Sequence, residues 1–153
     1  MALLNSTGGY EDVTVTASAT DHVFLARLTA PVNTKLKYKF RAWSKGVTAG
    51  NTPIRFTVVR GANLSGQAVS AVTLNKVNSQ DGETIQAALA RFTTQPSNVA
   101  ESNGTRQDSF VVTPLGGKGE SIPLQLNGGE VACLRAITAT NNGSVDWSVE
   151  VTE

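Results

Sequence analysis

Apolar and polar residues alternate with a period of two along most of this 153-residue chain. The clearest case is the segment from Lys35 to Trp43, where a basic residue stands at every second position as far as Arg41. Because successive side chains of a strand point to opposite faces, this segment predicts a strand with one core face and one basic face. The core face carries Leu36, Tyr38, Phe40 and Ala42, and the basic face carries Lys35, Lys37, Lys39 and Arg41.

The same alternation predicts further short strands, separated by turns that are rich in Gly, Asn and Pro. About eight strands at this spacing are typical of an antiparallel sandwich or barrel, so we expect an all-β protein. The chain shows neither an internal repeat nor a linker, which indicates a single domain over residues 13–153. Besides the segment above, the expected strands are Val13–Ala17, His22–Thr29, Pro53–Arg60, Ala68–Val77, Ser109–Leu115, Glu120–Leu126, Glu130–Thr140 and Ser144–Val151.

Two turns between these strands predict hairpins. Asn141-Asn142-Gly143 tolerates the positive φ that tight hairpin turns require, so the last two strands are expected to pair with each other. Gly116-Gly117-Lys118-Gly119 superficially resembles a phosphate-binding loop. It lacks the Lys-Ser/Thr ending and the following helix of such a loop, so we interpret it as a second hairpin turn.

The segment Glu83–Phe92 is the one stretch with helical character. Ile85, Leu89 and Phe92 stand at i, i+4 and i+7, which places them on one face of a helix. The threonines that follow also suit an extended chain. We expect one short helix here, with an extended segment as the alternative.

Residues 1–12 form an expected N-terminal arm in which two adjacent glycines allow backbone freedom. Its apolar residues Leu3, Leu4 and Tyr10 need something to bury them. Either they bind a neighbouring molecule, or they close the end of this chain's own barrel. We predict that deletion of Met1–Tyr10 leaves the fold intact and weakens attachment; a truncated protein that fails to fold would make the arm part of the core.

Composition and charge exclude several function classes. A hydrophobic content of 40% with 16% charged residues does not fit a disordered chain. The net charge of +1, with acidic and basic residues interspersed, gives little sign of the concentrated basic face of a nucleic-acid binder. No apolar run is long enough to span a bilayer, and the N-terminus lacks the pattern of a signal peptide. We therefore expect neither nucleic acid nor membrane as partner.

Residues for catalysis are almost missing. With one histidine (His22) and one cysteine (Cys133), the chain has no second histidine for a histidine-based metal site and no second cysteine for an internal disulfide. We therefore expect no enzyme activity, no cofactor and no metal. The basic face of the Lys35–Trp43 strand is either a solvated strand face or a surface that docks onto an acidic protein. We expect Trp43 and Trp147 in the core or in a subunit interface.

The order of several short motifs resembles small jelly-roll decoration proteins, also called cement proteins, which are encoded among the capsid genes of tailed bacteriophages. The resemblance covers roughly Phe24–Glu153; the first residues fall outside it, and Gln95 stands where an acidic residue is expected before the proline. The motifs are Ala30-Pro31-Val32-Asn33, Glu83-Thr84-Ile85-Gln86, Thr94-Gln95-Pro96, Thr113-Pro114-Leu115-Gly116-Gly117, Ile122-Pro123-Leu124, Gly128-Gly129-Glu130 and the C-terminal Trp147–Glu153.

This resemblance implies a homotrimeric jelly roll that sits on the outside of the virion, is assembled in the host cytoplasm and clamps neighbouring major capsid subunits. We take Leu3, Leu4, Tyr10, Lys35, Lys37, Lys39 and Arg41 as the candidate partner-binding residues. The alternative is a receptor- or glycan-binding module of a phage tail fibre or spike, which predicts exposed aromatic residues in the loops. The loops Ser44–Thr52 and Ser97–Gln107 contain none, which favours the capsid hypothesis.

Overall fold

The computed structural model describes residues 4–47, 53–62, 67–93, 104–113, 117–139 and 141–153. These residues form twelve strands and no helix, so none of them lies in a helix that could cross a membrane. The strands are β1 (Asn5–Val15), β2 (Val23–Thr29), β3 (Leu36–Val47), β4 (Ile54–Arg60), β5 (Val69–Val72), β6 (Asn75–Lys76), β7 (Ala88–Phe92), β8 (Thr105–Val112), β9 (Lys118–Glu120), β10 (Leu124–Leu126), β11 (Val131–Ile137) and β12 (Gly143–Thr152).

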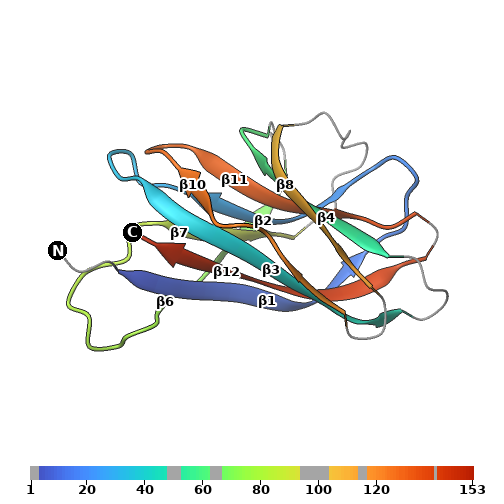
Figure 1. Cartoon of the computed structure of the whole chain (residues 1–153), viewed down its shortest axis with the longest axis horizontal. Coiled ribbons are helices and arrows are strands. Elements are labelled where there is room, and N and C mark those ends of the chain that lie inside the picture. Colours follow the sequence, from blue (N-terminus) through green and yellow to red (C-terminus); the bar gives the residue numbers. More distant parts are fainter. Residues whose placement is uncertain (1–3, 48–52, 63–66, 94–103, 114–116, 140) are drawn as a thin grey trace.

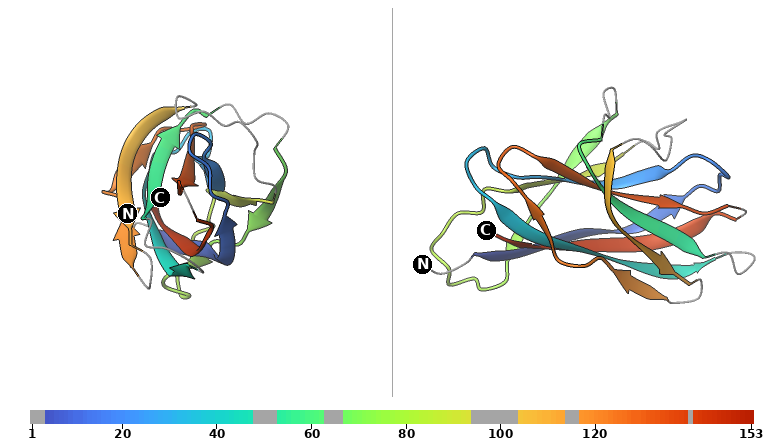
Figure 2. Two further views of the ribbon diagram at one scale, coloured as in Figure 1. Left: turned by 90° about the vertical axis from the view of Figure 1, so that its right-hand side faces the viewer. Right: turned by 45° about the horizontal axis from the view of Figure 1, so that its top comes forward.

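The strands form two antiparallel sheets that pack face to face (Figures 1 and 2). Sheet A has the order β10-β3-β12-β1-β6, with β9 also paired to β3. Sheet B has the order β5-β7-β2-β11-β4-β8. The prediction of an all-β sandwich is therefore confirmed.

The pairing is nested from the two ends of the chain inward. β1 pairs with β12, β2 with β11, β3 with β10, and β4 with β8. Successive members of this series lie in alternate sheets, as in a long hairpin that is rolled up, which is the jelly-roll arrangement of an antiparallel sandwich. The short strands β5, β6 and β7 come between β4 and β8 along the chain and extend the two sheets at their edges.

The core lies between the sheets and follows the alternation in the sequence. In β3, Leu36, Tyr38, Phe40 and Ala42 are buried, as predicted, and β12 alternates in the same way. From sheet B, Phe56 and Leu134 complete this main cluster. Sheet B also carries a second buried cluster, in which the Phe24 and Phe92 rings meet edge to face at 5.7 Å.

The expected N-terminal arm is wrong from residue 5 onward. Asn5 to Val15 form β1, which pairs with β12 on one side and with β6 on the other. Of the two alternatives left open for the apolar residues, burial within the chain's own fold holds for Leu4, which is 2% exposed, whereas Tyr10 is 40% exposed. The glycines serve close packing instead of freedom, since a Cβ on Gly8 would lie 2.7 Å from a Leu89 methyl group and one on Gly9 would lie 2.4 Å from the Trp147 carbonyl oxygen.

The expected helix at 83–92 and both expected hairpins are also wrong. Residues 83–87 are irregular, and residues 88–92 form β7, which pairs with β2 and β5. The strands on either side of Asn141-Asn142-Gly143 lie in opposite sheets, β11 in sheet B and β12 in sheet A. The same holds for β8 and β9, so these turns carry the chain from one sheet to the other.

Candidate binding surfaces

The basic face of β3 lies on the outer face of sheet A, turned away from sheet B, and half of it is neutralised by neighbouring strands. Glu120 of β9 accepts from Arg41 Nε at 3.0 Å and lies 3.4 Å from Lys39 Nζ. Arg41 also reaches Glu150 of β12, at 2.8 Å. These pairs hold the pKa of the Glu120 carboxyl below its usual value, mainly through the Arg41 hydrogen bond. This half of the stripe is a mixed-charge ladder.

The other half of the stripe carries free positive charge. Among the described residues, no acidic group lies within ion-pair distance of Lys35 or Lys37, and both are exposed. A shallow hollow of about 190 Å³ lies beside them, lined also by Thr152 and Glu153.

These two lysines stand at the start of β3, where Lys37 is in register with Thr152, and so belong to the end of the sandwich at which β1 begins and β12 ends (Figure 1). We call it the terminal end; it comprises Leu4, Val32, Lys35, Lys37, Val77 and Glu153. Val32, in the turn before β3, is 79% exposed, and Val77, next to β6, is 66% exposed. The Val77 amide donates to the Asn5 carbonyl at 2.9 Å, which fixes its segment beside β1. The terminal end therefore combines free positive charge with exposed apolar side chains.

Leu4 is buried and does not project towards a partner. It is 2% exposed, and its backbone carbonyl accepts from the Glu153 amide at 2.9 Å. The Glu153 carboxylate in turn accepts from the backbone amides of Gln86, at 3.1 Å, and Ala87, at 2.5 Å. Leu3 lies outside the described residues. The candidate residues Leu4, Lys35 and Lys37 thus lie at the same end of the molecule. Leu4 is buried there and stabilises the fold, whereas the two lysines are exposed.

Tyr10 lies further along β1, next to an irregularity. The register between β1 and β12 shifts between Tyr10 and Val13, and Asp12 has a φ of 59°, in the left-handed region. The Tyr10 ring is 40% exposed and stacks with Arg91 of β7, whose guanidinium carbon lies 4.2 Å from the ring centre. Tyr10 therefore bridges the two sheets through a cation–π contact and is not grouped with the basic stripe.

Two hydrogen-bonded contacts hold the bulge at Asp12 in place. The Asp12 amide donates to Asp146 Oδ1 at 2.9 Å. Lys45 Nζ lies 2.9 Å from Asp12 Oδ1 and 3.6 Å from Asp146 Oδ2. The hydrogen bond to Asp12 raises the pKa of the Lys45 ammonium, so this group stays charged between the two carboxylates.

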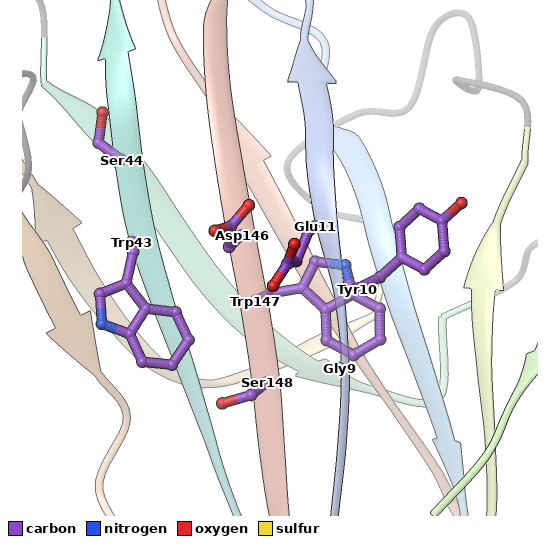
Figure 3. A pocket seen from close by; sticks show the side chains of 8 residues that line it. All are labelled: Gly9, Tyr10, Glu11, Trp43, Ser44, Asp146, Trp147 and Ser148. Carbon is purple, nitrogen blue, oxygen red and sulfur yellow. The ribbon is translucent and has the colours of Figure 1, made fainter.

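Beside the bulge, the outer face of sheet A is hollowed over a volume of about 640 Å³ (Figure 3). Trp43 of β3 lies on one side of this hollow, and Glu11 and Asp146 reach into it from β1 and β12. Trp43 is half-buried, whereas Trp147 is 1% exposed and belongs to the core. The expectation of a core or interface position thus holds for Trp147, and Trp43 lies on the outer face. We call this site the Trp43 hollow; its lining residues are Gly9, Tyr10, Glu11, Trp43, Ser44, Asp146, Trp147 and Ser148.

The remaining reactive groups are embedded in the fold. Cys133 is a free, fully buried thiol, and burial raises its pKa to about 12. His22 is buried and has interaction partners. Among the described residues, no three His, Cys, Asp or Glu side chains are grouped so that they could hold a metal ion.

The comparisons with known proteins add no relative. No protein-family model, no curated protein and no solved structure matches this chain. The sequence identified Lys35 and Lys37 as candidate binding residues, because basic and apolar residues alternate along the Lys35–Trp43 segment. It did not find the Trp43 hollow, because that site depends on a register shift between β1 and β12 that no local pattern marks.

Proposed function

We propose that this jelly roll is a structural virion protein that binds the outside of a tailed-phage capsid and stabilises contacts between major capsid subunits. The fold supports the proposal, because double-sheet jelly rolls are a recurrent architecture of viral capsid domains. The order of motifs along the chain supports it as well, since it resembles capsid decoration proteins. The observation that carries the proposal is the terminal end, where uncompensated lysines and exposed valines occur at the same end of the sandwich.

The contrast along β3 explains why the terminal end is the docking surface. Lys39 and Arg41 are already paired with glutamates of this chain, so they have little charge left for a partner. Lys35 and Lys37 keep theirs. Charges of this kind steer association with an acidic surface and fix its orientation more than they add affinity. Neighbouring apolar side chains add affinity when a partner buries them.

Three copies acting together make such a modest contact sufficient. A closed ring of identical subunits presents the same end three times to a shell that has local three-fold symmetry. Once one copy is bound, the others bind at high effective concentration, so the avidity exceeds the single affinity by orders of magnitude. A homotrimer therefore needs only a small attachment surface on each subunit. The expected mass in solution is three times the 16.0 kDa of one chain, which light scattering after gel filtration measures.

The test is cosedimentation of the protein with expanded capsids of its phage at low and high salt. We expect Lys37→Glu to weaken binding strongly and high salt to do the same to the wild type. The matched control is Lys118→Glu, because Lys118 is exposed and lies towards the other end of the same sheet, where it opposes Trp43. Wild-type protein is also expected to raise the temperature at which particles release DNA. Equal effects of the two variants would place the docking surface elsewhere, and no effect of the wild type on particle stability would refute the proposal.

A further inference from the structure

The Trp43 hollow is the feature of this molecule that neither the packing of the core nor the attachment at the terminal end explains. An indole on the outer face of a sheet gains only part of the burial that it gains in a core. The rest of this face is polar and charged, with Lys37, Lys39 and Arg41 along the same strand. Ligand-binding sites are concave and combine aromatic side chains with a few converging polar groups, and both are present here; a volume of about 640 Å³ fits a small ligand.

The backbone of β1 also lines the hollow. Gly9 adds no side chain to it, because a Cβ there would lie only 2.4 Å from the Trp147 carbonyl oxygen of β12. The bulge that follows places Glu11 at the edge of the hollow, opposite Asp146. Bulges and left-handed residues recur at functional sites, where they re-aim side chains.

The strands on either side of Trp43 carry charged residues of both signs. Trp43 stands in register with Asp146 of β12 on one side and with Lys118 of β9 on the other. Ser148, the next outward residue of β12, adds a hydroxyl that can both donate and accept. Around one apolar ring there are thus carboxylate acceptors, an ammonium donor and a hydroxyl.

We propose that the Trp43 hollow binds a saccharide, with one face of a pyranose ring stacked on the indole and its hydroxyls hydrogen-bonded to Glu11, Asp146 and Ser148. A pyranose combines an apolar C–H face with a rim of hydroxyls that donate and accept, which matches this composition. The carboxylates accept from sugar hydroxyls, and charge-assisted bonds of this kind are stronger than neutral ones.

A cationic side chain fits the hollow less well. Lys45 already lies between Asp12 and Asp146 and neutralises part of their charge. Lys118, across from Trp43, repels a second cation. The contact between the Asp12 amide and Asp146 also fixes one carboxylate before any ligand arrives, and such preorganisation lowers the cost of binding a neutral ligand. This inference does not depend on the capsid proposal, because it concerns a different surface.

The test uses the two indole N–H signals that a chain with two tryptophans gives in a ¹H–¹⁵N NMR spectrum. The intact protein is titrated with glucose, galactose, mannose, rhamnose and N-acetylglucosamine, with disaccharides of these, and with purified bacterial O-polysaccharide. We expect at least one of them to shift the Trp43 signal saturably, while the signal of the buried Trp147 moves little. Tetralysine is titrated in parallel as the cationic probe.

The variants identify the groups that bind. Trp43→Ala is expected to weaken saccharide binding about tenfold or more, and Trp43→Phe to retain part of the affinity. Glu11→Gln is expected to weaken binding without unfolding the protein, because Glu11 is exposed. Lys37→Ala, on the same strand and face, is the matched control and keeps wild-type affinity. A Trp43 signal that responds to no saccharide of the panel, or that responds to tetralysine alone, overturns the proposal. Saccharide binding that survives both Trp43→Ala and Glu11→Gln overturns it as well.

Discussion

Removal of residues 1–10 is the perturbation that separates a structural first strand from a detachable arm. The deletion takes away six of the register pairs between β1 and β12, from Asn5 with Thr152 to Tyr10 with Trp147. An antiparallel pair makes about one hydrogen bond per register pair, and each contributes a net ~1 kcal/mol. Burial of Leu4 adds about 1.5–3 kcal/mol. The sum, roughly 8 kcal/mol, compares with a total stability of about 5–15 kcal/mol for a typical domain.

We therefore expect the protein that starts at Glu11 to be unfolded or only marginally folded at 25 °C. Urea unfolding followed by circular dichroism measures this directly. The control is a deletion of Met1–Leu3, which leaves every register pair of β1 in place and is expected to retain nearly full stability. If the chain from Glu11 onward unfolds cooperatively at almost the urea concentration of the full chain, β1 contributes little and our reasoning about this strand fails.

Three further predictions concern buried or paired groups. Tyr38 has a buried hydroxyl without a protein hydrogen-bond partner among the described residues, so Tyr38→Phe should leave stability unchanged or raise it by about 1 kcal/mol, as urea unfolding measures. Because burial raises the pKa of Cys133 to about 12, this thiol should not react with Ellman's reagent at pH 8 until guanidinium unfolds the protein. The backbone amide of Asn127 donates to the Glu130 carboxylate and lowers its pKa. This hydrogen bond stabilises the fold fully at a pH above 4.5, the ordinary pKa of the group, and the stabilisation is lost as the pH falls through the lowered pKa. Glu130→Gln should therefore lower the melting temperature at pH 7, by an amount that shrinks below pH 4.5.

The sequence predicted best where one face of a strand is buried and the other is solvated. In β3 and β12, every second residue is buried, so the period of two is visible in the letters themselves. For the same reason, the sequence alone was enough to place the two lysines of the terminal end on the outer face of a strand. Whether they were paired could not be predicted, because Glu120 and Glu150 come from strands far away along the chain.

The sequence misled where a strand is buried on both faces. In β7, Leu89 belongs to the main core, whereas Phe92 packs against Phe24 in the second cluster. Residues three apart in a strand point to opposite faces, so two buried faces give apolar residues at i and i+3. A helix gives the same spacing on one face, and the two are not distinguishable by periodicity in a short segment. The tertiary position of the strand decided the outcome.

The wrong hairpins follow from the topology. Turn chemistry reports that the chain reverses direction, and Asn-Gly tolerates the required backbone angles both in a tight hairpin and in a wider connection. In a jelly roll, the strands on either side of a connection lie mostly in different sheets, so β12 pairs with β1 and β3 and not with its chain neighbour β11. Local sequence carries no record of such long-range partners.

The two proposed binding surfaces lie at separate places along sheet A, so both can be occupied at the same time. Along β3, Lys37 pairs with Thr152 beside the termini, whereas Trp43 pairs with Asp146 beside the bulge. Six residues of strand separate them, which is roughly 20 Å. A subunit that is held to a shell by its terminal end therefore keeps the Trp43 hollow clear of the attachment surface. Since the two sites share no residue, each variant should impair one of them only: Lys37→Glu should lose capsid binding and keep saccharide binding, and Trp43→Ala should do the reverse. Joint loss in either variant would mean that one surface serves both ligands.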